Sequence, residues 1–204
     1  MVHNVATMKD AKLLGGIGSI LTLLGGVPNL GAAALVGYVL ILIAVKYISD
    51  ITGDKKIFDN MLISVIALIA GLVIAIIAII GAVFSIIFVA PHTFTPENIR
   101  PGTIILSIIT PLFVVWLALT LGAYYLKKAY DQIAAYTGVD MFKTAGLLYL
   151  IGAATSIVII GLLILLVANI LQTIAFFTLP DTYQPRTQPP VQSSPPPPPP
   201  PPTS

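Results

Sequence analysis

The 204-residue chain contains no cysteine and few charged residues. Without cysteine it forms no disulfide scaffold and no thiol-based catalytic site. Asp, Glu, Lys and Arg make up 9% of the residues, against roughly 25% in ordinary soluble domains. A formal net charge of +2 provides no basic stripe of the kind that binds nucleic acid. We therefore expect neither a soluble globular domain nor a nucleic-acid partner.

Side chains that usually carry chemistry are also scarce. The two histidines, His3 and His92, have no second ligand at metal-binding spacing. No Asp, Glu, Lys, Arg or His falls in the middle of an apolar segment, where pumps and proton-coupled carriers usually keep one. We expect a protein that is not an enzyme and that uses no metal or cofactor.

Long apolar segments fill most of the chain, in which 57% of the residues are hydrophobic. Four charge-free stretches hold 133 of the 204 residues; they are 13–45, 60–96, 101–126 and 144–180. A transmembrane helix needs roughly 20 such residues, and a Gly-Gly-Val-Pro-Asn turn signal at 25–29 divides the first stretch. We predict an all-α, polytopic transmembrane bundle over 1–179. Its spans, about five in number, are predicted at about 9–25, 30–49, 60–89, 102–126 and 143–176.

The positive charges are unevenly distributed about these spans. Five spans place only Arg100 and Arg186 on one face and eight lysines on the other. The lysines are Lys9, Lys12, Lys46, Lys55, Lys56, Lys127, Lys128 and Lys143. Because cytoplasmic loops are enriched in Lys and Arg, we predict a multi-pass protein of the cell membrane with its N-terminus in the cytoplasm and its C-terminus outside. Whether 9–25 crosses completely stays open, because its apolar part is short.

Small residues recur at helical spacing in two predicted spans. Ala67, Gly71 and Ala75 lie four residues apart in the third span, and Gly152 and Ser156 repeat the spacing in the fifth. Such stripes let helices approach closely. They are predicted to form either the packing core within one chain or the face of a homo-oligomer.

Two other residues stand out within the predicted spans. Pro111, in the middle of the fourth span, is expected to kink it. Asn169 carries an amide that needs hydrogen-bond partners inside the membrane. We interpret Asn169 as a link between helices or as part of a solute-binding site.

Two predicted cytoplasmic turns have similar sequences. Gly53 and Gly138 each follow a helical run and suit a left-handed helix end. Asp54 and Asp140 come at or near the start of the next helix, where an N-cap is expected. The similarity is explained either by a parallel repeat of two hairpins or by ordinary turn composition.

Residues 180–204 have a different composition, with 12 of the chain's 17 prolines and eight consecutive ones at 195–202. Such a segment cannot form a packed core. Eight prolines in a polyproline II helix span roughly 25 Å. We predict a disordered, proline-rich tail that is either a docking arm for a protein partner or a solvated extension.

Three strings resemble a known family: AKLLGGIGSIL at 11–21, VKYISD at 45–50 and IFDNM at 57–61. They are similar to the archaeal domain-of-unknown-function family nine-ninety-six, over roughly residues 8–180. The resemblance implies an α-helical bundle in an archaeal cell membrane, and it implies no catalytic or binding residues.

Two functions agree with these features. The first is a non-catalytic scaffold embedded in the lipid bilayer, with the proline-rich arm for a protein partner. The second is a passive channel or a transporter of small solutes or lipids. The sequence favours the first, and the second is kept as the alternative.

Overall fold

The computed structural model describes residues 7–27, 29–84 and 101–183, and within these it contains six helices and no strand. The helices are α1 (Met8–Leu24), α2 (Gly31–Thr52), α3 (Lys55–Phe84), α5 (Pro101–Thr137), α6 (Met141–Ala154) and α7 (Ile159–Phe177). Four of them, α2, α3, α5 and α7, are long and apolar enough to cross a membrane. The predicted all-α transmembrane bundle is confirmed. Most of the proline-rich tail, residues 184–204, lies outside the described residues.

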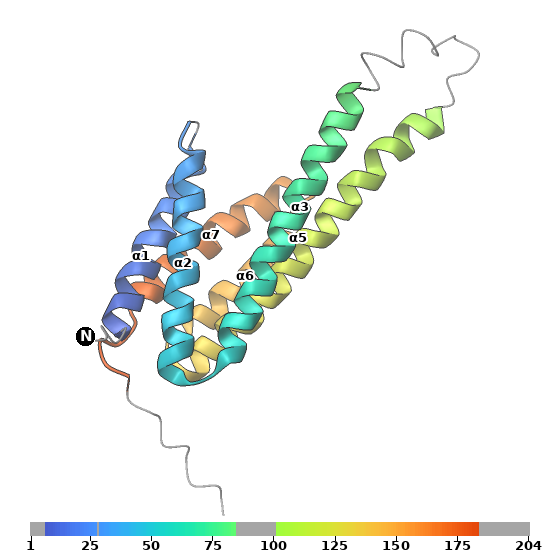
Figure 1. The fold of residues 1–204 in the computed structure, drawn as a ribbon. Coiled ribbons are helices and arrows are strands. Elements are labelled where there is room, and N and C mark those ends of the chain that lie inside the picture. Colours follow the sequence, from blue (N-terminus) through green and yellow to red (C-terminus); the bar gives the residue numbers. More distant parts are fainter. Residues whose placement is uncertain (1–6, 28, 85–100, 184–204) are drawn as a thin grey trace, which may run out of the picture.

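The helices form three antiparallel hairpins (Figure 1). The helix pairs α1–α2 and α3–α5 are the two long hairpins, and they are joined at the lysine-rich end of the molecule by the turn between α2 and α3. The third hairpin, α6–α7, is shorter, and it packs against α5 on one side and α1 on the other. The upper parts of α3 and α5 extend beyond the rest of the bundle as a pair.

The two similar turns have the predicted backbone conformation. Gly53 and Gly138 are left-handed, with φ of 75° and 77°, and a conformation of this kind favours glycine. Asp54 caps α3, since its Oδ1 accepts from the Lys56 N–H at 3.0 Å. Asp140 stands at the N-cap of α6 but makes no cap hydrogen bond with its side chain. Beyond the turns the likeness ends, because α3 has 30 residues and α6 has 14.

The fifth span, expected as one helix over 143–176, is instead divided into α6 and α7. At the break, 155–158, both hydroxyl groups bond to carbonyl groups at the end of α6. The Thr155 hydroxyl donates to the Ile151 carbonyl at 2.7 Å, and the Ser156 hydroxyl donates to the Ala153 carbonyl at 2.8 Å. Trp116 Nε1 from α5 donates to the Ala154 carbonyl at 3.0 Å. With 14 residues, α6 is about 21 Å long, shorter than the roughly 30 Å hydrocarbon core.

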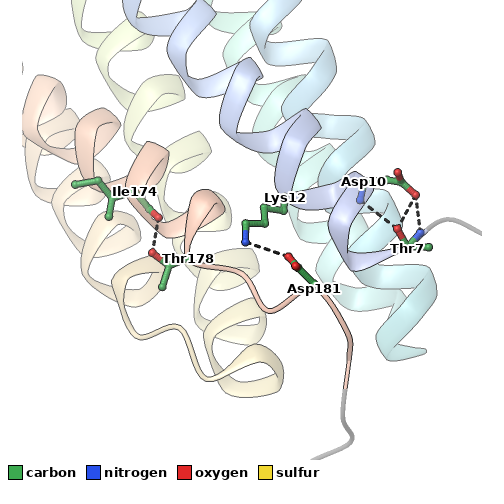
Figure 2. A network of polar contacts seen from close by, with 6 residues as sticks. All are labelled: Thr7, Asp10, Lys12, Ile174, Thr178 and Asp181. Carbon is green, nitrogen blue, oxygen red and sulfur yellow. Dashed lines mark hydrogen bonds and ion pairs between the residues drawn. The ribbon is translucent and has the colours of Figure 1, made fainter.

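This break brings the two ends of the described chain together (Figure 2). Lys12 Nζ, near the start of α1, lies 3.1 Å from Asp181 Oδ1, just beyond the end of α7. Residues in direct contact cannot lie on opposite faces of a bilayer with a core of about 30 Å. The contact therefore bears on the predicted threading, with the ends on opposite faces, which stays a prediction.

A reciprocal cap starts α1 beside this contact (Figure 2). The Thr7 hydroxyl accepts from the Asp10 N–H at 3.3 Å, and Asp10 Oδ2 accepts from the Thr7 N–H at 2.9 Å. The hydrogen bonds that the Asp10 carboxylate accepts, first from the backbone N–H of Thr7 and then from its hydroxyl at 2.8 Å, lower the pKa of Asp10 from its ordinary value. A lowered carboxyl pKa means that the cap contributes stability above the ordinary pKa and loses it as the pH falls.

Candidate functional site

A cavity of about 550 Å³ lies between the two long hairpins, and the α6–α7 hairpin closes one side of it. Its walls are mainly apolar, and their aliphatic side chains come from every side of the bundle. Examples are Leu35 and Leu42 on α2, Val65 and Leu68 on α3, Leu119 on α5 and Leu165 on α7. The cavity exists because α1–α2 and α3–α5 pack tightly as pairs but meet each other only through a smaller contact between α2 and α3.

Several residues in the cavity wall are also open to the surroundings. Leu35 is 68% exposed and Val39 is 56% exposed on α2, and Ile69 is 54% exposed on α3. These helices are among the four that are long and apolar enough to cross a membrane. The cavity therefore opens sideways between α2 and α3, toward the lipid that surrounds apolar helices of this kind.

The polar edge of the cavity is built around Asn169. Its Nδ2 donates to Thr22 Oγ1 over 3.4 Å, which links α7 to α1. Its Oδ1 is buried, and none of the described residues supplies it with a hydrogen-bond donor. Leaving a buried acceptor unpaired costs about 1–3 kcal/mol. Asn169 therefore contacts α1 through one half of its amide and presents an unused acceptor in the cavity wall through the other.

Other residues with hydroxyl groups line the same cavity. Tyr149 on α6 lies beside Asn169, and Tyr38 on α2 lies near Tyr149. Both tyrosines line the cavity, as do Ser64 and Ser156. None of the lining residues in the described part of the chain is charged. The cavity thus combines a large apolar wall with a neutral hydrogen-bonding edge.

Near the cavity, a buried series of side-chain hydrogen bonds joins α5, α7 and α1. The Tyr130 hydroxyl on α5 donates to Gln172 Oε1 on α7 at 2.7 Å, and Gln172 Nε2 donates to Ser19 Oγ on α1 at 2.8 Å. Ser19 Oγ in turn donates to the Gly15 carbonyl at 2.8 Å. Gln172 uses both ends of its amide in this series, so we assign it to holding the bundle together rather than to a ligand.

The predicted stripe of small residues on α3 faces α5 of the same chain. A Cβ on Gly71 would lie 3.1 Å from the Cβ of Ala118. Ala67 lies opposite Gly122, whose Cβ would stand 3.5 Å from the Ala67 Cβ. Ala67 and Gly71 thus contact α5 within the same chain. Ala75 is half-buried on the same helix.

The remaining predicted residues have separate places in the fold. Gly152 packs on Leu165, which would lie 2.8 Å from an added Cβ, and so it joins α6 to α7. Ser156 lies in the turn between these helices and lines the cavity. Pro111 is half-buried within α5, and the helix continues through it.

The described residues contain no group of three or more His, Asp or Glu side chains that would hold a metal ion. His3 and His92 lie outside the described residues. Sequence reasoning did not find Tyr38 or Tyr149, because nothing local indicates that two distant helices face the same cavity. Asn169 and Gln172 are three residues apart in the sequence, so they lie on the same face of α7. This spacing was the sequence feature that indicated a polar face on this apolar helix.

Comparisons with known proteins agree with the resemblance found in the sequence. Residues 33–170 match the family described as Protein of unknown function (DUF996). An uncharacterized protein of Methanocaldococcus jannaschii is 38% identical over 175 residues, which cover 85% of this chain and 94% of that protein. No solved structure matches the chain. With most of its length matched in both comparisons, this chain belongs to the DUF996 family.

Proposed function

We propose that this protein is a non-catalytic, multi-pass membrane protein that binds a lipid-like molecule in the cavity between its hairpins. Of the two functions suggested by the sequence, lipid binding in this cavity agrees with the lipid transporter rather than with the scaffold. The observation that carries the proposal is the cavity of about 550 Å³. Small-molecule sites typically have volumes of roughly 300–1,000 Å³.

The chemistry of the walls favours a lipid-like ligand over a polar solute. Leucine, valine and isoleucine side chains line the opening between α2 and α3, so an apolar molecule can enter directly from the bilayer. A molecule that enters from the bilayer gains no hydrophobic free energy, because lipid tails are as apolar as these walls. It is stabilised in the cavity by packing that is closer than in lipid and by hydrogen bonds at the polar edge. A passive channel would need polar groups along its path, and these walls offer few.

Filling the cavity tests the proposal. Val39→Trp places a large ring in the cavity wall, and we expect it to lower the binding of tritiated 1-octadecene and oleyl alcohol at least tenfold. The measurement is equilibrium binding to the purified full-length protein in mild detergent. Val36→Trp is the matched control, because Val36 lies on the same helix, is 54% exposed and does not line the cavity. Equal binding by both variants would contradict the proposal.

We also propose a threading in which both ends lie in the cytoplasm. The contact between Lys12 and Asp181 supports this, because it joins the start of α1 to the end of α7 on the lysine-rich side. Arg186 then follows five residues after Asp181 and joins the eight lysines, so that nine of the ten Lys and Arg residues share one face. This distribution, nine against one, fits the enrichment of Lys and Arg on the cytoplasmic face better than the eight against two of the five-span threading.

Reporter tags measure this directly. Tags at residue 2 and residue 204 of the protein in intact cells should both be inaccessible to impermeant reagents and become accessible after permeabilisation. A tag inserted after residue 92, between α3 and α5, should react in intact cells and serves as the control for access. A C-terminal tag that reacts in intact cells would restore the five-span threading.

The proline-rich arm remains a separate hypothesis. Under this threading residues 180–204 lie on the cytoplasmic side, where a protein with an aromatic groove would recognise polyproline II. We propose this arm only as an accessory to lipid binding, on the basis of its composition. A homo-oligomer is likewise a proposal, and the α3 stripe does not support it because Ala67 and Gly71 pack on α5.

A further inference from the structure

We propose that the cavity selects an uncharged amphiphile, a long hydrocarbon chain that ends in a hydroxyl group, and that this hydroxyl donates a hydrogen bond to Asn169 Oδ1. The inference rests on the proposed function and names the class of ligand for the same cavity. It follows from three observations: the unpaired acceptor, the hydroxyl groups in the same cavity wall and the neutral lining.

The unpaired acceptor defines what the polar end of the ligand must offer. Asn169 Nδ2 is engaged with Thr22, so the Oδ1 half of the amide is the half that lacks a partner among the described residues. An oxygen of this kind needs a donor. A hydrocarbon or a simple ester supplies none, whereas a hydroxyl group supplies one. A hydroxyl also accepts, and the Tyr149 hydroxyl beside Asn169 can donate to it.

The lining also determines the charge of the ligand. No charged residue lines the cavity within the described part of the chain. The nearest cation along α6, Lys143, comes six residues before Tyr149, which is about 9 Å along a helix. Lys127, at the lysine-rich end of α5, is already paired with Asp131. A phosphate or carboxylate at Asn169 would therefore be buried without a counter-charge, and such burial is strongly unfavourable.

The orientation of the ligand follows from the same geometry. Asn169 and Tyr149 contribute the polar edge from the α6–α7 side, whereas the exposed wall residues Leu35, Val39 and Ile69 lie at the opening between α2 and α3. The hydroxyl end thus enters first and reaches the amide. The hydrocarbon chain then lies along the apolar walls and extends through the opening into the bilayer.

Competition binding tests the selectivity. Tritiated oleyl alcohol is bound to the purified full-length protein in mild detergent and displaced by unlabelled oleyl alcohol, oleyl phosphate or 1-octadecene. We expect oleyl alcohol to bind at least tenfold more tightly than either competitor. In Asn169→Leu, which keeps the side chain's size and removes the acceptor, the affinity for oleyl alcohol should fall about five- to tenfold, as expected for one hydrogen bond. The affinity for 1-octadecene should not fall.

A matched control and a second variant separate the loss of the ligand's hydrogen bond from a general effect on folding. Asn60→Leu removes another half-buried asparagine, which donates to Gln132 at 3.0 Å outside the cavity, and it should leave the affinity for oleyl alcohol unchanged. Tyr149→Phe removes one hydroxyl and keeps the ring, and it should weaken oleyl alcohol binding even if Asn169→Leu fails to fold.

The outcomes separate this inference from the proposed function. Equal affinities for oleyl alcohol and 1-octadecene, unchanged in Asn169→Leu and Tyr149→Phe, would overturn the inference and leave the lipid-binding cavity standing. Tighter binding of oleyl phosphate would overturn it as well, because the ligand would then be charged. If no probe binds above the level of Val39→Trp, the proposed function itself is wrong.

Discussion

Replacing Gly18 by leucine is expected to separate α1 from α2 and to destabilise the protein by about 3 kcal/mol, at the upper end of the usual cost of overpacking. A Cβ on Gly18 would lie 2.7 Å from the Gly37 carbonyl oxygen and 3.0 Å from the Ile41 nitrogen. Gly37 is equally confined, since its Cβ would collide with the Gly18 carbonyl oxygen. The obstacle on both sides is backbone, which cannot rotate away as a side chain does.

The apparent melting temperature in mild detergent measures this effect, together with the yield of monodisperse protein. Gly81→Leu is the matched control, because Gly81 lies on α3 and an added Cβ there meets nothing within 4 Å. We expect Gly81→Leu to melt close to the unmodified protein and Gly18→Leu to melt far lower or to aggregate. Similar melting temperatures for the two variants would mean that α1 and α2 do not pack as the structure shows.

Replacing Gln172 by leucine is expected to destabilise the protein by about 2 kcal/mol, within the usual range for a buried polar group left without its partner. Gln172 is 3% exposed and bonds to Tyr130 on α5 and to Ser19 on α1. Without its amide, the Tyr130 hydroxyl, in a residue with no exposed surface, loses its acceptor. In the membrane, a lost donor or acceptor of this kind finds no water to replace its partner.

A double-mutant cycle isolates this hydrogen bond from general packing. Tyr130→Phe removes the hydroxyl that would be left without an acceptor in Gln172→Leu. The double variant should therefore lose less stability than the sum of the two single variants. Gln132→Leu provides the control, because Gln132 is half-buried and accepts one bond from Asn60, and it should cost less than Gln172→Leu. Strict additivity of Gln172→Leu and Tyr130→Phe would contradict the buried series of hydrogen bonds.

Much of the architecture follows from local sequence. Apolar runs longer than a bilayer core requires become α2, α3 and α5, and the positions of Gly53 and Gly138 predict the left-handed turns that join helices on the lysine-rich side. The division of 144–180 was harder to predict. Thr155 and Ser156 look like ordinary intramembrane hydroxyls, since each can bond its own helix at little cost. The turn depends on contacts between helices: α7 packs back on α6, and Trp116 of α5 donates to the Ala154 carbonyl.

The amino-acid sequence alone determined a helical membrane protein, because hydropathy and charge act on each segment independently of the others. It also identified Asn169 as a polar group in need of a partner. The cavity, the joined ends and the neighbours of Asn169 depended on the tertiary structure. Thr22, Tyr38 and Tyr149 come from three different helices. They share one cavity because two hairpins diverge from a common base and a third closes the gap between them, and that arrangement results from contacts between residues distant in the sequence.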